Sequence, residues 1–205
     1  MSVCAYNNMD SILVRCHSPV YGEIAEITNG SAQQFAKRNG MGYFDFLTVD
    51  DKPGPYMAKV DRMIELFDEK VVHRIVYADV DVVFNKGVNM PDWMKGPLCI
   101  SSDPSGISTG FMVVTWQAYE LLKTWASMGE ASQYKTHSHD QASLVLMHEF
   151  LPWVRRLVSV IPEDVVSCPE SRVSRGSLAH HFWANGFGKF PQWKEEMKRY
   201  AMEQV

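Results

Sequence analysis

Short apolar runs alternate with amphipathic stretches along nearly the whole chain, and this alternation restricts the fold more than any other feature of the sequence. It is typical of an α/β domain in which helices flank a mostly parallel central sheet. The strand-like runs are residues 2–6, 43–49, 73–84, 97–101, 110–115 and 158–161. The helix-like patterns are residues 22–39, 57–69, 116–128, 140–150 and 191–204. The 205 residues contain no repeat, low-complexity tract or linker, so we predict one domain.

The composition argues against several classes of protein. With 20 Lys and Arg against 24 Asp and Glu, the net charge is −4, so the chain lacks the basic excess typical of nucleic-acid binding. No run approaches the ~18 apolar residues of a membrane-spanning helix, and no signal peptide is visible. The 4 cysteines are widely spaced and form no CxxC pair, which argues against a zinc cage or a disulfide scaffold. We expect a cytoplasmic protein without a transmembrane segment, and its oligomeric state stays open.

Two aspartates interrupt the strand-like run at residues 73–84. Strand periodicity places the carboxylates of Asp79 and Asp81 on the same face, where like charges repel. Such a pair is tolerated at a strand end beside a ligand crevice, where a cation neutralises it. The alternative is an N-cap followed by a solvated turn residue, but the apolar run continues directly at 82–84 and no helix begins there. We therefore predict a divalent-metal site, and aspartate oxygens suit Mg²⁺ or Mn²⁺.

A second polar cluster, HSHDQ at residues 137–141, stands directly before a helix pattern. Helix capping explains it in one interpretation, because Ser138 or Asp140 can accept backbone N–H bonds while Gln141 lies in the first turn. A catalytic role is compatible with capping. A carboxylate at the mouth of a helix faces the crevice at the strand ends, where open α/β sheets bind their ligands.

The third cluster is AHHFWANGFGKFPQW at residues 179–193. Adjacent histidines such as His180 and His181 are often surface residues without a function. Here they precede glycines and Lys189, and a backbone free to approach a ligand beside a point charge suits phosphate oxygens. If the fold brings this segment to Asp81, two carboxylates and one imidazole could hold a metal beside a phosphate-binding lysine.

These clusters, taken with two further segments, resemble elements of known glycosyltransferases. YADVDVVF resembles the DxD strand of enzymes with the GT-A fold, and YMAKVDRMIELF before it resembles the helix whose lysine approaches the donor. STGFMVVTWQAYELLKTW resembles the "(N/S)-(S/C/T)-G-(V/F)" strand and its following helix, and HDQ resembles the Asp-Gln element near the donor sugar. HFWANGFGKFPQW is similar to the terminal His…Gly…Lys-Pro-Trp element. The order matches glycosyltransferase families 8 and 34 over most of residues 43–193, and the chain also resembles small GT-A domains of large algal viruses.

The resemblance implies a single GT-A (Rossmann-like) domain. Residues 1–115 would form mainly the nucleotide-sugar and metal-binding half. Residues 116–205 would form mainly the acceptor side, with a C-terminal element that binds metal and diphosphate. The implied activity is the metal-dependent transfer of a sugar from a nucleotide-diphosphate sugar, UDP derivatives first, to a hydroxyl of a saccharide or glycan acceptor. The chain would act alone or as a domain of a longer, viral or other enzyme.

The resemblance also implies the metal ligands. Asp81 and His181 would bind Mn²⁺ or Mg²⁺ directly, and Asp79 would face the donor or hold the metal through water. His181 is preferred over His180 because it precedes phenylalanine, as in the "HF" pattern of family 34. Lys189 would stabilise the leaving diphosphate. It lies eight positions after His181, against six in family 8, and a phenylalanine separates it from the proline.

Further residues are implied around the donor and acceptor sugars. Lys59, with Arg62, would approach the donor sugar or phosphate. Asp140 would be the general base if the enzyme inverts, or would position the donor if it retains, with Gln141 stabilising the reacting centre.

Tyr6 and Asn7 would bind the base of the nucleotide by stacking and hydrogen bonding. Their alternative roles are those of a core aromatic residue and a turn residue. Three tryptophans are candidates for stacking on acceptor sugars, namely Trp183, which we favour, Trp116 and Trp125.

Two other functions fit parts of the sequence. A haloacid-dehalogenase-type phosphatase would use Asp79 as its nucleophile, since DVDVV fits that motif, but the late acidic pair of that class is missing. A non-catalytic nucleotide-sugar-binding module with the same fold is the second alternative.

Overall fold

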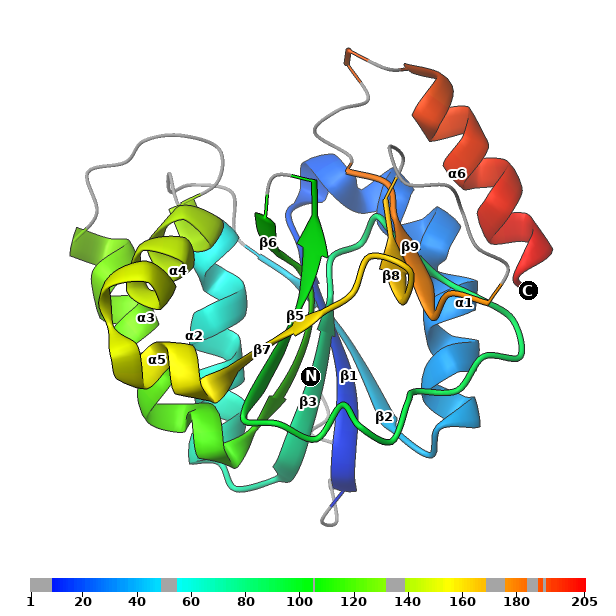
Figure 1. The fold of residues 1–205 in the computed structure, drawn as a ribbon. Coiled ribbons are helices and arrows are strands. Elements are labelled where there is room, and N and C mark those ends of the chain that lie inside the picture. Colours follow the sequence, from blue (N-terminus) through cyan, green and yellow to red (C-terminus); the bar gives the residue numbers. More distant parts are fainter. Residues whose placement is uncertain are drawn as a thin grey trace.

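The computed structural model describes residues 9–48, 55–104, 106–131, 139–168, 176–183, 188–189 and 191–205. Its centre is a six-stranded sheet in the order β2-β1-β3-β6-β5-β7 (Figure 1). The strands are β1 (Met9–His17), β2 (Gly42–Leu47), β3 (Val72–Ala78), β5 (Leu98–Asp103), β6 (Gly106–Thr115) and β7 (Val158–Ile161). β1 pairs in parallel with β2 and β3, and β5 with β7, whereas β6 runs antiparallel between β3 and β5. Only β6 is reversed within this sheet, which confirms the predicted α/β class with a mostly parallel sheet.

Helices cover both faces of the sheet (Figure 1). They are α1 (Gly22–Arg38), α2 (Pro55–Asp68), α3 (Tyr119–Ala131), α4 (His139–Phe150), α5 (Pro152–Leu157) and α6 (Pro191–Glu203), with short 3₁₀ turns η1 (Pro19–Tyr21) and η2 (Trp116–Ala118). Successive residues of β1 point to opposite faces of the sheet and so belong to different hydrophobic cores. Ile12 and Val14 belong to a core shared with α2, α3 and α4, whereas Leu13 belongs to a second core shared with α1. α6 packs against α1 in a third, smaller core.

A second, three-stranded sheet in the order β4-β9-β8 lies beside α1 (Figure 1). Its strands are β4 (Val82–Phe84), β8 (Val166–Ser167) and β9 (Ala179–His181). The strand-like run at residues 73–84 is therefore two strands in two different sheets, and the two aspartates that interrupt the run stand directly after the first strand. β3 ends at Ala78, residues 79–81 turn, and β4 pairs antiparallel with β9. Two carboxylates two positions apart do not continue a ladder that is buried on both faces, because buried charge is costly without a partner.

The remaining predicted elements agree with the structure to within a few residues at their ends, except for the first strand. The strand predicted at 2–6 lies outside the described residues, and the strand at Met9–His17 was not predicted because Arg15 interrupts its apolar pattern. The short elements α5, β8 and β9 were also missed. Across the ranges that the structure describes, no helix combines the length and the apolar character that a membrane crossing needs.

Candidate metal centre and active site

Backbone hydrogen bonds fix the turn between β3 and β4. The N–H of Asp79 donates to the carbonyl of Gly110 on β6 at 2.8 Å, and the N–H of Val82 donates back to the carbonyl of Asp79 at 3.1 Å. The carbonyl of Asp81 accepts the N–H of Phe182, the residue after β9, at 3.0 Å. The two aspartates are thus fixed from both sides by strands that lie far away in the sequence.

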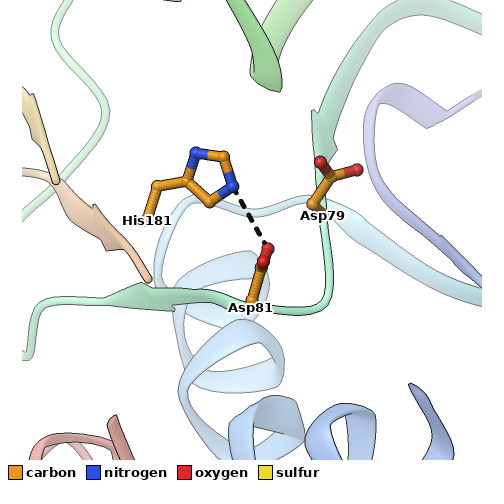
Figure 2. Close-up of side chains that lie close together, drawn as sticks. All are labelled: Asp79, Asp81 and His181. Atoms are coloured by element: carbon orange, nitrogen blue, oxygen red, sulfur yellow. Dashed lines mark ion pairs between the residues drawn. The ribbon is translucent and has the colours of Figure 1, made fainter. Parts of the chain in front are cut away.

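Asp79, Asp81 and His181 converge at this turn (Figure 2). Each offers one ligand atom, and the three atoms all lie within 4.8 Å of one another. The Nε2 atom of His181 lies 3.2 Å from Oδ1 of Asp81. Two carboxylate oxygens and one imidazole nitrogen form a donor set that suits Mn²⁺ and related divalent ions. The structure therefore brings together the three residues that the sequence predicted as metal ligands.

His180 lies on the other side of β9, as strand alternation requires. Its Nδ1 atom lies 2.7 Å from the hydroxyl of Ser167, and its ring packs edge-on against Phe182. Burial, together with the charge on His181, lowers the pKa of His180 to about 4, so this imidazole is neutral. Of the two adjacent histidines, only His181 faces the aspartates.

Gly110 makes room for the imidazole of His181. A Cβ atom at position 110 would lie 2.1 Å from Cε1 of His181, so the imidazole could not stay where it is. On another side the ring of Trp183 stands edge-on to the imidazole, with centroids 6.3 Å apart and an interplanar angle of 83°. Trp183 has a φ of 51°, in the left-handed region that bulky residues rarely adopt. The imidazole is therefore cradled by a glycine and a strained tryptophan, and this cradle fits the role of a held metal ligand.

The charges of the cluster favour a cation. Burial raises the pKa of Asp79 despite the nearby Lys59 ammonium, and the Asp81 carboxylate adds to the rise. Burial disfavours the charged form of His181, but the Asp81 carboxylate outweighs it and the pKa of His181 is raised. The two carboxylates are thus costly to ionise side by side, and a divalent ion would relieve this repulsion.

Lys59, on α2, joins this cluster to a second carboxylate. Its side chain is only 4% exposed, and its Nζ atom lies 2.7 Å from Oδ2 of Asp140 and 3.5 Å from Oδ1 of Asp79. Nζ also donates to the carbonyl and the hydroxyl oxygens of Thr109, both at 3.2 Å. The hydroxyl of Tyr77 donates to the same Asp79 oxygen at 2.6 Å. Burial lowers the pKa of Lys59, but Asp140 and Asp79 outweigh it and the pKa is raised, so Lys59 stays charged.

Asp140 is buried in the first turn of α4. Its Oδ2 atom accepts the Thr109 hydroxyl as well as the Lys59 ammonium. Gln141, the next residue, is half-buried. The indole of Trp125 donates to the backbone carbonyl of Asp140 at 2.9 Å, and Trp125 is fully buried. This tryptophan is a core residue that supports α4, and it cannot stack on a sugar.

Four other residues that the sequence predicted for the donor site remain, two of which lie among the described residues. The guanidinium of Arg62 lies over the ring of Phe46, 4.0 Å from its centroid, and also contacts Glu65. Lys189 is exposed. Tyr6 and Asn7 lie outside the described residues. Sequence reasoning missed the roles of Thr109, Gly110 and Tyr77, although Thr109 and Gly110 stand in the segment that resembles a family motif.

The chain has no match among protein-family models or among curated proteins. Its fold is similar to the crystal structure of a glycosyltransferase involved in the glycosylation of the major capsid of PBCV-1. The TM-score is 0.73 at 14% sequence identity, and the match covers 92% of this chain and 98% of that one. At this identity the likeness establishes the fold. The chain thus has a Rossmann-like α/β fold that is also found in that glycosyltransferase, and it carries a cluster of two aspartates and one histidine at the turn after β3.

Proposed function

We propose that this protein is a metal-dependent glycosyltransferase of the GT-A type that takes its sugar from a nucleoside-diphosphate sugar, UDP derivatives first. The acceptor would be a hydroxyl of a saccharide or glycan. One observation carries the proposal, namely the convergence of Asp79, Asp81 and His181 within 4.8 Å at the end of β3. In open α/β sheets, ligands lie in the crevice at the carboxyl ends of the strands. The likeness of the fold to a glycosyltransferase supports the same assignment.

Asp79, Asp81 and His181 would hold the ion, which supplies Lewis-acid stabilisation to a diphosphate leaving group. The exposed Lys189 would add positive charge on the same phosphates. These assignments explain why two carboxylates, the half-buried Asp79 and the buried Asp81, lie together at a strand end. They also explain why the segment around β9 returns to the turn between β3 and β4.

Asp140 and Gln141 would lie beside the donor sugar. The Asp140 carboxylate is already held by the Lys59 ammonium and the Thr109 hydroxyl, so we propose that Asp140 positions the donor rather than removes a proton. This favours the retaining form of the chemistry, with Gln141 beside the reacting carbon. Lys59 would set the distance between Asp140 and Asp79, since its ammonium contacts both carboxylates.

The nucleoside would lie near the carboxyl ends of β1 and β2. β1 ends at His17, well after Tyr6 and Asn7, so we propose that the first turn after β1 takes over the base-binding role that the sequence assigned to those two residues. Trp183, half-buried beside His181, remains our candidate for stacking on the acceptor sugar. Both halves of the chain contribute residues to the proposed site. Asp79 and Asp81 precede residue 115, whereas Asp140 and His181 follow it.

The test is thermal stability with UDP-sugars, with and without Mn²⁺. Ligands that bind only the folded state raise its apparent stability by mass action. We expect a UDP-sugar to raise the unfolding temperature only when Mn²⁺ is present, and Asp81→Ala to lose this effect. The matched control is Asp92→Ala, which removes an exposed aspartate paired with Lys95 and should change nothing. A UDP-sugar effect that is independent of metal would contradict the proposal. Covalent trapping of Asp79 by beryllofluoride would favour the phosphatase instead.

A further inference from the structure

We propose that Thr28, oriented by the buried Arg15, is a positioning residue that holds the Asp79–Asp81 turn in its metal-binding form. The inference rests on the proposed metal site and adds residues that do not touch the ion. It starts from a contact between α1 and the turn. The hydroxyl oxygen of Thr28 lies 2.6 Å from the backbone carbonyl of Val80, the residue between the two aspartates.

The Thr28 hydroxyl has one hydrogen and several acceptors within reach. The carbonyls of Ile24 and Ala25 in its own helix lie 3.0 Å and 3.4 Å away, farther than the carbonyl of Val80. The shortest contact is therefore the one between α1 and the turn. Thr28 is fully buried, so water does not compete for this hydrogen bond.

Arg15 determines which way the hydroxyl points. Its Nη2 atom donates to the Thr28 oxygen at 3.0 Å and to the carbonyl of Ala25 at 3.1 Å. An oxygen that accepts a hydrogen bond from a guanidinium must direct its own hydrogen elsewhere, here to Val80. Hydrogen bonds with an ionised partner are stronger than neutral ones, and chains of such bonds reinforce one another.

Arg15 is a costly residue for this position. It is 0% exposed, yet its closest carboxylate oxygen, on the partly exposed Asp45, lies 3.9 Å away. Among the described residues its Nε atom has no hydrogen-bond partner. Apolar residues of similar volume often replace a buried, imperfectly paired charge without loss of stability. The contact with Thr28 gives this arginine a role that an apolar residue of similar volume would not have.

The hydrogen bond from Thr28 adds to the backbone hydrogen bonds that hold the turn from β6 and from the end of β9. Asp79 is held through its N–H by Gly110, and Asp81 through its carbonyl by Phe182. Rotation of the Val80 peptide would move both carboxylates at once, because that residue separates them. Thr28 opposes this rotation from the side of α1. Metal affinity should therefore depend on a hydroxyl that lies in another element and touches neither the ion nor the donor.

The experiment measures the dissociation constant of Mn²⁺ by electron paramagnetic resonance, with UDP present and absent, beside the unfolding temperature of the metal-free protein. We expect Thr28→Val to weaken Mn²⁺ binding about tenfold, since it removes one buried hydrogen bond at nearly constant volume. Thr28→Ser keeps the hydroxyl and should bind Mn²⁺ like the unchanged protein. Arg15→Met should also weaken Mn²⁺ binding while the metal-free protein keeps or gains stability. The matched control is Thr124→Val, which removes a helical threonine bonded to its own helix at Glu120.

Several results would overturn the positioning role of Thr28. If Thr28→Val binds Mn²⁺ as tightly as the unchanged protein, or if Thr28→Ser loses as much affinity, the positioning role is wrong. If Thr28→Val does not fold, Arg15→Met carries the test, and unchanged Mn²⁺ affinity in that variant overturns the inference. If the unchanged protein binds no Mn²⁺, the proposed function fails first. That result is distinguishable because no variant is needed to see it.

Discussion

The ammonium of Lys59 lies 2.7 Å from a carboxylate oxygen of Asp140, and both side chains are almost completely buried. The same ammonium is 3.5 Å from Asp79, so a single cation links the proposed metal cluster to the proposed donor-sugar site. The two carboxylates come from different elements, the end of β3 and the start of α4, and Lys59 fixes their separation. We expect the pair to serve both stability and the proposed function, and substitutions can separate the two roles.

Replacing Lys59 by Met should strongly destabilise the protein, because Asp140 would be left as a buried carboxylate without its cation. Breaking such a pair costs about 3–5 kcal/mol in the free energy of unfolding. The double variant Lys59→Met/Asp140→Asn should recover most of that loss while transfer activity stays absent. Urea unfolding and a donor-transfer assay measure the two effects separately. Lys123→Met, at an exposed lysine, is the control. A stable and active single variant would show that the pair has neither role.

Gly110→Ala should weaken metal binding with little change elsewhere. The added methyl group would lie 2.1 Å from the imidazole of His181, so the ring must move away from the aspartates. Displacing a ligand from its supported orientation typically lowers metal affinity by about 10–100-fold. Calorimetric titration with Mn²⁺ measures the loss. Gly22→Ala is the matched control, because no atom lies within 4 Å of a Cβ there. Equal affinity in both variants would argue against His181 as a ligand.

The pKa of His181 should fall in Asp81→Asn, because the Asp81 carboxylate is what outweighs burial and raises this pKa. A raised folded-state pKa adds stability that is fully present below the unfolded value and is lost as pH rises through the folded value. The metal-free protein should therefore lose stability as the pH rises from the unfolded-state pKa of His181 to its raised folded-state pKa. Asp81→Asn should lose less stability over this pH range. Mn²⁺ must displace the proton, so its affinity should rise over the same window. An NMR titration of the imidazole measures the pKa directly. If His181 has the same pKa in Asp81→Asn and in the control Asp92→Asn, the Asp81 carboxylate is not what raises it.

Trp183→Gly should relieve backbone strain and remove a proposed sugar contact. Glycine adopts a φ of 51° freely, whereas tryptophan does so at a cost. The unfolding temperature should stay level or rise, while the KM for the acceptor rises and hydrolysis of the donor continues. Trp183→Phe keeps an aromatic face and should retain more acceptor affinity. Unchanged acceptor kinetics in Trp183→Gly would remove Trp183 from the site.

The helices and the acidic turn were predictable because their signals are local. Apolar spacing marks α2, and Asp79 and Asp81 stand out in a run that otherwise reads as buried strand. β1 was missed because Arg15 is a charged residue whose partners, Thr28 and Tyr43, come from other elements. A local pattern cannot show that such a charge is buried.

The details of the site depend on tertiary contacts. The preference for His181 over His180 came from a neighbouring phenylalanine, and the alternation of β9 supplies the physical reason. The pairing of Lys59 with Asp140 requires α2 and α4 to meet. The position of Gly110 against the imidazole requires β6 and β9 to converge at one turn. None of these contacts leaves a periodic trace in the sequence.

Electron spin-echo envelope modulation of bound Mn²⁺ tests the metal site most directly, because it detects the nitrogen of a coordinated imidazole. With UDP and Mn²⁺ present, we predict a nitrogen signal in the unchanged protein and in His180→Gln, and its loss in His181→Gln. A Mn²⁺ ion that binds without any nitrogen signal, or a signal that survives in His181→Gln, would contradict coordination by Asp79, Asp81 and His181.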